Sequence, residues 1–251
     1  MTDLSKTDCE LNELGWWSNW SHLIWLDKNR YVLTSKEFEE PLFNHGGFLT
    51  PIRGLEAKIN GIEHIFDKAH IAPSFFLWNS SEFNETANRL VTSGYRIIDQ
   101  LSVMQLLSPN LRINPKIELE AVKKDTILWS TTYLSAFYGE QTLTDQVEGA
   151  LRKASADPSN LLVMAIQDGR PVGTLAAHSS DTIVGAYCVG VVPGQQGMGV
   201  ASTMLDFAYN FAKERGSQLV LQTFISDALE GFYRRRGFHR LSSKDVYVKG
   251  P

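Results

Sequence analysis

The stretch "VGVVPGQQGMGVAST", from Val189 to Thr203, carries three closely spaced glycines between a strand-like apolar run and a long amphipathic segment. Glycine has no Cβ, so the backbone N–H groups of such a loop can approach a ligand closely. Apolar residues recur every three or four positions over residues 198–215, which predicts a helix directly after the loop. Because a helix N-terminus attracts anions, the stretch predicts a phosphate-binding strand, loop and helix.

Two common nucleotide-binding patterns do not match this loop. A Walker A loop has a lysine directly after its second glycine, but Val200 and Ala201 follow Gly199. A dinucleotide-binding loop needs a third small residue and an acidic residue after the next strand, and neither Ser202 nor the strand "QLVLQTF" supplies these well. A third pattern, Gln/Arg-x-x-Gly-x-Gly/Ala, fits completely from Gln196 to Ala201.

The residues around the loop predict a mixed α/β sheet with helices on both faces. Strands are expected at residues 116–122, 160–166, 171–178, 181–192, 218–224 and 238–249, and helices at 125–140, 198–215 and 227–237. A further helix is expected to begin at Thr142 or Thr144 and to end before Pro158. Asp168 and Gly169 indicate a hairpin between two of the strands. Gly216 and Gly237 are expected to end the last two helices.

Two prolines and two asparagines in "LLSPNLRINPK", residues 106–116, indicate a domain boundary, so we place domains at residues 1–113 and 114–251. Residues 54–107 repeat the helix-strand-helix-strand order that ends the second half. The segment "ANRLVTSGYRII" resembles "EGFYRRRGFHRL", with Gly94 where Gly237 stands. This similarity favours a diverged duplication, and the alternative is a common way of packing a helix, a glycine and a strand.

Composition excludes several classes of protein. The chain has 251 residues, 43% hydrophobic and 21% charged, which suffices for a full core. Its net charge of -4, with 10 basic and 14 acidic residues in the first half and 14 of each in the second, argues against nucleic-acid binding. No apolar run is long enough to span a membrane and no export signal is visible, so a cytoplasmic location is expected. Cys9 and Cys188 predict neither a disulfide framework nor a metal site.

Two segments together resemble the GNAT N-acetyltransferase superfamily. They are "VGVVPGQQGMGVASTMLDFAYNFAKERG" and "LQTFISDALEGFYRRRGF", within a resemblance that covers roughly residues 116–249. The resemblance implies a GNAT fold, with a second catalytic half and a degenerate first half that lacks the CoA-binding motif. It also implies transfer of an acetyl group from acetyl-CoA to a primary amine of a small molecule or peptide, by direct attack in a ternary complex and without a metal.

The resemblance also assigns roles to single residues. It places acetyl-CoA against Val189, Gly190, Val191, Gln196, Gly197, Met198, Gly199, Val200, Ala201, Ser202 and Ser226, although Ser226 stands where the family often has asparagine. Tyr233 stands where the family has a tyrosine that protonates the leaving thiolate. The ordinary pKa values, about 8.5 for a thiol and about 10 for a phenol, make this transfer feasible. Glu140 and Tyr187 are the substrate-side candidates, and His178 and Asp181 remain further candidates for the base.

Other interpretations of these residues stay open at this point. The glycine loop also fits an ordinary turn, and Tyr233 also fits a packed core tyrosine. The whole motif set is compatible with a CoA-binding module that has no turnover, or with an enzyme that uses a longer acyl-CoA. The sequence names no acceptor amine and leaves a homodimer open.

Overall fold

The computed structural model describes residues 4–123, 126–139 and 142–249. Contacts between Cα atoms divide the chain into two compact units. Unit 1 contains residues 1–103, 223–230 and 240–251, and unit 2 contains residues 104–222 and 231–239. The domain boundary at residue 113 stays a prediction. The two units differ from the predicted domains because residues 223–230 and 240–251 belong to unit 1. The reason is strand pairing, because residues 244–248 pair with residues 74–78.

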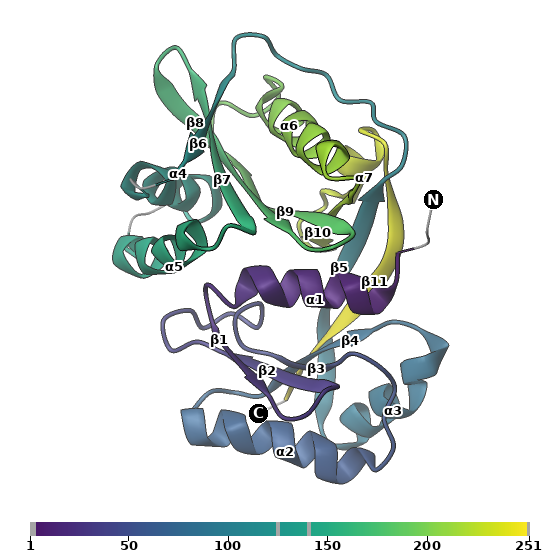
Figure 1. The fold of residues 1–251 in the computed structure, drawn as a ribbon. Helices are drawn as coiled ribbons and strands as arrows, with labels where there is room; N and C mark the ends of the chain where they lie inside the picture. The colour runs from purple at the N-terminus through teal and green to yellow at the C-terminus, as the bar shows by residue number, and fades with distance from the viewer. Residues whose placement is uncertain (1–3, 124–125, 140–141, 250–251) are drawn as a thin grey trace. The chain divides into compact units, whose positions relative to one another are not determined.

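Unit 1 is built on a mixed sheet (Figure 1). Its elements are α1 (Lys6–Trp17), β1 (His22–Trp25), β2 (Arg30–Thr34), β3 (Gly46–Phe48), α2 (Leu55–Ala69), β4 (Ser74–Trp78), the 3-10 turn η1 (Ser81–Phe83), α3 (Asn84–Thr92), most of β5 (Tyr95–Leu106) and the end of β11 (Phe238–Lys249). The strand order is β1-β2-β3-β4-β11-β5. The pairs β1–β2, β2–β3 and β4–β11 are antiparallel, whereas β3 and β4 run parallel.

The core of unit 1 is aromatic. Trp16, Trp17 and Trp20 from the segment "GWWSNW" are buried and pack with their ring centroids about 6 Å apart. Phe43 meets Trp17 edge to face at 5.4 Å. Aromatic side chains bury large apolar areas, so this cluster stabilises the start of the chain against the sheet. The three tryptophans therefore belong to the core of unit 1.

A buried ion cluster joins α1 to β11 within unit 1. The ammonium group of Lys244 is fully buried and pairs with the carboxylates of Glu10, at 2.6 Å, and Glu13. The hydroxyl of Tyr31 donates a hydrogen bond to Glu10. Burial opposes the charge of Lys244, but the two carboxylates outweigh this and raise its pKa. The lysine is therefore held as a cation in the interior.

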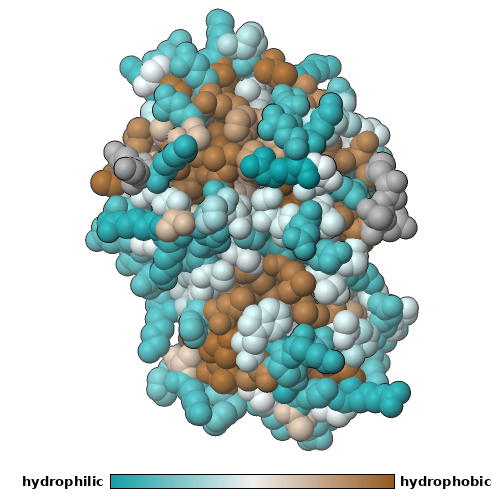
Figure 2. Space-filling model, in the orientation of Figure 1, coloured by the Kyte–Doolittle hydropathy of each residue, from teal (hydrophilic) through white to brown (hydrophobic). Residues whose placement is uncertain are grey.

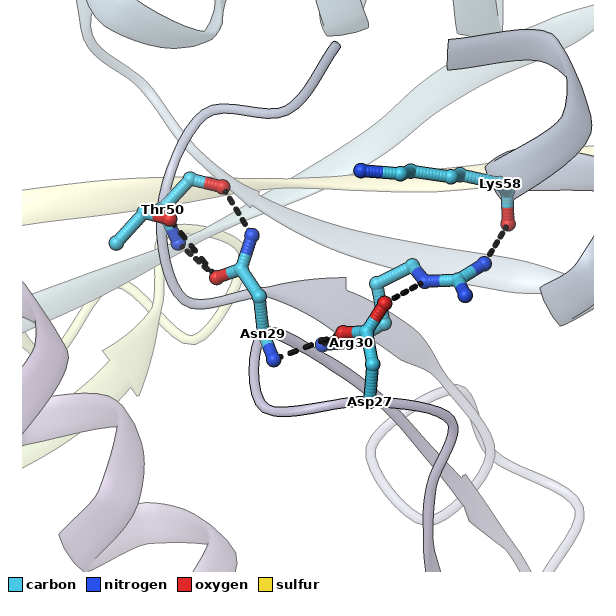
Figure 3. A network of polar contacts seen from close by, with 5 residues as sticks. All are labelled: Asp27, Asn29, Arg30, Thr50 and Lys58. Carbon is cyan, nitrogen blue, oxygen red and sulfur yellow. Dashed lines mark hydrogen bonds and ion pairs between the residues drawn. The ribbon is translucent and has the colours of Figure 1, made fainter. Parts of the chain in front are cut away.

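A smaller polar network fixes the turn between β1 and β2 (Figure 3). The carboxylate of Asp27 accepts hydrogen bonds from the backbone N–H groups of Asn29, at 2.8 Å, and Arg30, at 2.9 Å, and from Arg30 Nε at 2.8 Å. Arg30 also donates to the carbonyl oxygen of Lys58 in α2, and Asn29 exchanges hydrogen bonds with Thr50. The backbone hydrogen bond from Asn29, followed by the side chain of Arg30, lowers the pKa of Asp27.

We expect Asp27→Ala to lower the free energy of unfolding of unit 1 by about 1 kcal/mol at pH 7, because the turn loses its acceptor. The folded-state pKa of Asp27 lies below its ordinary value of 3.8. The stabilisation by the ionised carboxylate is therefore fully present above pH 3.8 and is lost as the pH falls through the folded-state pKa. Urea unfolding at several pH values between 3 and 7 measures this difference. Asp27→Asn keeps one acceptor oxygen and should lose less, and a difference that grows towards low pH would contradict the prediction.

Unit 2 carries the glycine loop. Its elements are β6 (Glu118–Val122), α4 (Ile127–Phe137), α5 (Thr144–Ala156), β7 (Asn160–Gln167), β8 (Arg170–Ser179), β9 (Ile183–Val191), α6 (Val200–Glu214), most of β10 (Gln218–Phe224), most of α7 (Glu230–Arg234), and the end of β5 and start of β11. The strand order is β5-β10-β9-β8-β7-β6. The pair β9 and β10 is parallel, whereas β6 to β9 pair antiparallel. The predicted mixed α/β sheet is confirmed.

Helices cover both faces of the sheet in unit 2. A Cβ on Gly173 of β8 would meet Val200 and Met204 of α6. On β9, a Cβ on Gly190 would meet the Phe137 ring of α4. Because Gly190 pairs with the residue after Gly173, these two glycines point to opposite faces, so α4 and α6 cover opposite sides (Figure 1).

The surface near α6 includes apolar side chains. In Figure 2, polar side chains cover much of the visible face, and apolar ones gather in two areas, one near where Figure 1 draws β8 and α6 and one near where it draws β2 and β3. A hollow of about 340 Å³ in unit 2 is lined by Ile113, Ile117 and Leu119 and by Phe207 and Phe211 of α6. The outer side of α6 is therefore only partly covered by polar groups.

Candidate active site

The glycine loop connects β9 to α6 and leaves its backbone accessible. Gly194, Gly197 and Gly199 have φ angles of +84°, +79° and +85°, in the left-handed region that side chains rarely adopt. Gln196, Gly197 and Met198 are exposed. Gly199 is the N-cap of α6, which begins at Val200 rather than at the expected residue 198 because the glycine leaves the helical conformation. The loop thus presents backbone groups to solvent at the N-terminus of a 15-residue helix.

Asn114 braces this helix start, a role that no local sequence pattern indicates. Its side-chain amide donates to the carbonyl oxygen of Met198 at 2.8 Å, and its backbone N–H donates to Thr203 Oγ1 at 2.9 Å. A Cβ on Gly199 would lie 3.2 Å from the Asn114 Cβ, which is tighter than ordinary contact. The brace therefore holds the end of the glycine loop against the first turn of α6.

Arginines gather around the first turn of α6. Arg236 Nε donates to Ser202 Oγ at 2.7 Å, and its guanidinium lies 3.3 Å from the centroid of the Phe232 ring. Burial, together with the nearby charges of Arg235 and Arg112, lowers the pKa of Arg236 below its ordinary value. Several positive charges in one place at a helix N-terminus favour a bound anion. Ser202, predicted to contact the ligand, is buried beneath Arg236.

Strand β9 is irregular just before the loop. Thr174 pairs with Gly190 and Ala176 pairs with Tyr187, so one residue of β8 stands opposite two residues of β9, which is a β-bulge. The paired residues of β9 and β10 end at Ala186 and Leu221, five residues before β9 ends at Val191. The two bulged residues are Cys188 and Val189, directly before Gly190. The close neighbour of Gly190 is the Phe137 ring.

Tyr233 lies in α7 and is almost fully buried, with 5% of its surface exposed. Its ring meets Phe238 at 5.8 Å and Phe232 at 5.2 Å, both nearly edge to face. It belongs to the main core cluster of unit 2, together with Met204 of α6. This packing fixes the Tyr233 ring in the core of unit 2. The catalytic role of its hydroxyl stays a prediction.

The remaining predicted residues are not gathered at one point. Tyr187 is buried in β9, and Glu140 lies outside the described residues. His178 Nδ1 lies 2.6 Å from Asn160 Oδ1, and burial lowers the pKa of the His178 ring, which favours its neutral form. Ser226 belongs to unit 1, where its hydroxyl donates to Asp99 at 2.5 Å. The candidate site in unit 2 therefore consists of the glycine loop, the β-bulge, the arginines and Tyr233.

Comparison with known proteins decides the family of this unit. Residues 125–238 match the model of the acetyltransferase (GNAT) family. This segment is a GNAT domain. It contains the loop, the bulge, α6 and Tyr233. A search of curated proteins found no match.

Solved structures extend the GNAT fold to the whole chain. A GCN5-related N-acetyltransferase from Kribbella flavida has a TM-score of 0.72 at 15% identity, and the match covers 98% of this chain and 95% of that one. A protein of unknown function from Staphylococcus epidermidis has a TM-score of 0.70 at 15% identity, covering 91% and 94%. A tandem GNAT protein from the clavulanic acid pathway has a TM-score of 0.61 at 10% identity, covering 88% and 83%. The predicted GNAT fold in a two-part chain is confirmed.

Two further findings concern the described residues alone. Within residues 4–123, 126–139 and 142–249, no helix is both long and apolar enough to cross a bilayer. In the same ranges, no three side chains of histidine, cysteine, aspartate or glutamate are placed to hold a metal ion.

Proposed function

We propose that the GNAT domain transfers the acetyl group of acetyl-CoA to a primary amine of a small molecule or peptide, in a ternary complex. The observation that carries this proposal is the exposed loop over Gln196 to Gly199, which caps α6 beside Arg236. Left-handed glycines, a helix N-terminus and clustered guanidinium groups together suit a pyrophosphate. We assign Gln196, Gly197, Met198, Gly199, Val200 and Ala201 to this group.

The strand before the loop suits the rest of the ligand. The parallel pairs with β10 end at Ala186, five residues before β9 ends at Val191. We assign Val189, Gly190 and Val191 to the pantetheine arm and to the thioester carbonyl. Backbone N–H groups aimed at a carbonyl oxygen stabilise the negative charge that develops there.

The reaction follows from these assignments. The amine nitrogen attacks the thioester carbon, its bond to that carbon forms, and negative charge collects on the carbonyl oxygen. When the tetrahedral intermediate collapses, the bond from carbon to sulfur breaks, and the phenol of Tyr233 gives its proton to the thiolate. The attacking amine gives up a proton to a base or to water, and a proton from the same source returns to the Tyr233 phenolate, so the products are an amide and CoA.

We expect Tyr233→Phe to lower kcat at least about 100-fold, because the thiolate then leaves without a proton donor. The phenylalanine keeps the ring in the core, so the Kd of acetyl-CoA should stay within about twofold. Released thiol is followed with a panel of amino acids, polyamines and peptides, and binding is measured by calorimetry. Tyr209→Phe removes a hydroxyl from the half-buried side of α6 and is the control.

Each result has a distinct meaning. Equal rates for native protein and Tyr233→Phe would remove Tyr233 from the mechanism. Binding of acetyl-CoA without thiol release from any amine would overturn the enzymatic proposal in favour of a CoA-binding module. Faster release from longer acyl-CoA donors would overturn acetyl as the transferred group.

A further inference from the structure

Strand β9 contains an unusual backbone conformation next to the proposed thioester position. Cys188 has a φ of +51°, in the left-handed region that disfavours side chains. The other described residues with positive φ that are not glycine, His70, Asp168 and Ala228, lie in turns or at a helix end. Cys188 alone among them lies within a strand, at the β-bulge. Glycine is the usual residue at such a bulge position, so surrounding contacts must stabilise the positive φ of Cys188.

The hydroxyl of Thr174 holds this conformation. Thr174 Oγ1 donates a hydrogen bond of 3.0 Å to the carbonyl oxygen of Cys188. Thr174 is fully buried on β8, so this bond satisfies a carbonyl group in the interior. Phe137 of α4 occupies the space beside Gly190, two residues further along β9. The bulge is therefore held by a hydrogen bond from the neighbouring strand and by a ring from the helix above.

The orientation of one peptide plane depends on this bond. A left-handed residue turns the peptide that follows it away from the direction it has in a regular strand. The peptide between Cys188 and Val189 includes both the carbonyl that Thr174 binds and the N–H of Val189. Fixing the carbonyl oxygen therefore also fixes the direction of that N–H.

We propose that Thr174 is a positioning residue for acyl transfer, because its hydroxyl sets the backbone that polarises the thioester carbonyl. This inference rests on the proposed function, in which main-chain groups near Val189 bind that carbonyl. A donor aimed in advance at the developing oxyanion accelerates the reaction without reorientation. Thr174 itself touches Cys188 and acts through it.

The test compares Thr174→Val with Thr174→Ser. Valine keeps the shape and removes the donor, whereas serine keeps the donor. Acetyl-CoA labelled with ¹³C at the carbonyl is bound to each protein, and its carbonyl stretch is read by isotope-edited infrared spectroscopy. We expect the native protein and Thr174→Ser to shift the stretch to lower frequency than in water. Thr174→Val should lose most of that shift and about tenfold in kcat, with a KM for acetyl-CoA within about twofold.

A second variant separates positioning from folding. Cys188→Gly adopts a positive φ without strain, so adding it to Thr174→Val should restore the carbonyl shift and most of kcat. Thr132→Val is the matched control, because it removes a buried hydroxyl that donates to Leu128 within α4. It should leave the carbonyl shift unchanged.

The outcomes distinguish this proposal from the proposed function. If the native protein binds no acetyl-CoA, the proposed function fails and this inference fails with it. If acetyl-CoA binds with a shifted carbonyl and Thr174→Val keeps both the shift and kcat, the role of Thr174 is wrong while the proposed function stands. A defect in Thr174→Val that Cys188→Gly does not repair would equally overturn positioning through Cys188.

Discussion

Replacing Lys244 with methionine is expected to lower the free energy of unfolding of unit 1 by about 3–5 kcal/mol. Methionine fills most of the same space but leaves the buried carboxylates of Glu10 and Glu13 without their cation. Desolvation already raises the pKa of Glu10. The loss should therefore shrink as the pH falls and Glu10 takes up a proton, because a neutral group tolerates burial better.

Lys249→Met is the matched control for this prediction. Lys249 lies on the same strand and pairs with Glu63 at 2.7 Å, but its side chain is 45% exposed. A solvated pair contributes at most about 1 kcal/mol. Urea unfolding followed by tryptophan fluorescence compares the two variants, and five of the six tryptophans lie in unit 1. Losses of similar size at the two positions would show that the buried cluster contributes no more than a surface pair.

Replacing Gly237 with alanine is expected to destabilise unit 2 by at least about 3 kcal/mol. Gly237 has a φ of +92°, and a Cβ there would lie 1.6 Å from the backbone oxygen of Ser108. The backbone carbonyl of Gly237 also accepts hydrogen bonds from the N–H groups of Leu107 and Ser108. The neighbour is backbone rather than a flexible side chain, so alanine requires the chain around residues 107–109 to move.

Gly216→Ala separates the clash from the conformational strain. Gly216 follows α6 with a φ of +66°, and a Cβ there meets nothing within 4 Å. Only the left-handed conformation is then disfavoured, by about 1–2 kcal/mol. Urea unfolding monitored by far-ultraviolet circular dichroism measures both variants. An equal loss for the two glycines would mean that the contact between Gly237 and Ser108 is easily relieved.

Local features of unit 2 could be predicted from the sequence. Asp168 and Gly169 form the expected turn, both with positive φ, and Gly216 and Gly237 follow the ends of their helices as predicted. The glycine loop lies where its pattern placed it, between β9 and α6. These features depend on residues close together in the chain. Backbone preference and periodicity therefore suffice to predict them.

Features that depend on partners far away in the sequence could not be predicted from the sequence. Asn114 braces a loop 84 residues away in the sequence. An asparagine before a proline is typical of an ordinary turn, so the local pattern does not indicate this contact. Thr174 looked like any strand threonine until its partner Cys188 was known. Lys244 pairs with a residue 231 positions earlier. Side-chain contacts of this range follow from the folded path of the chain, which local patterns do not specify.

The buried cluster of Lys244 also has a consequence for the order in which the protein is made. A ribosome completes Glu10 and Glu13 long before it reaches Lys244, so a nascent chain cannot yet neutralise these carboxylates. Unit 1 also lacks the β11 partner of β4 until that moment. Residues 1–103 therefore obtain this cation and this strand partner only after the last part of the chain has been made.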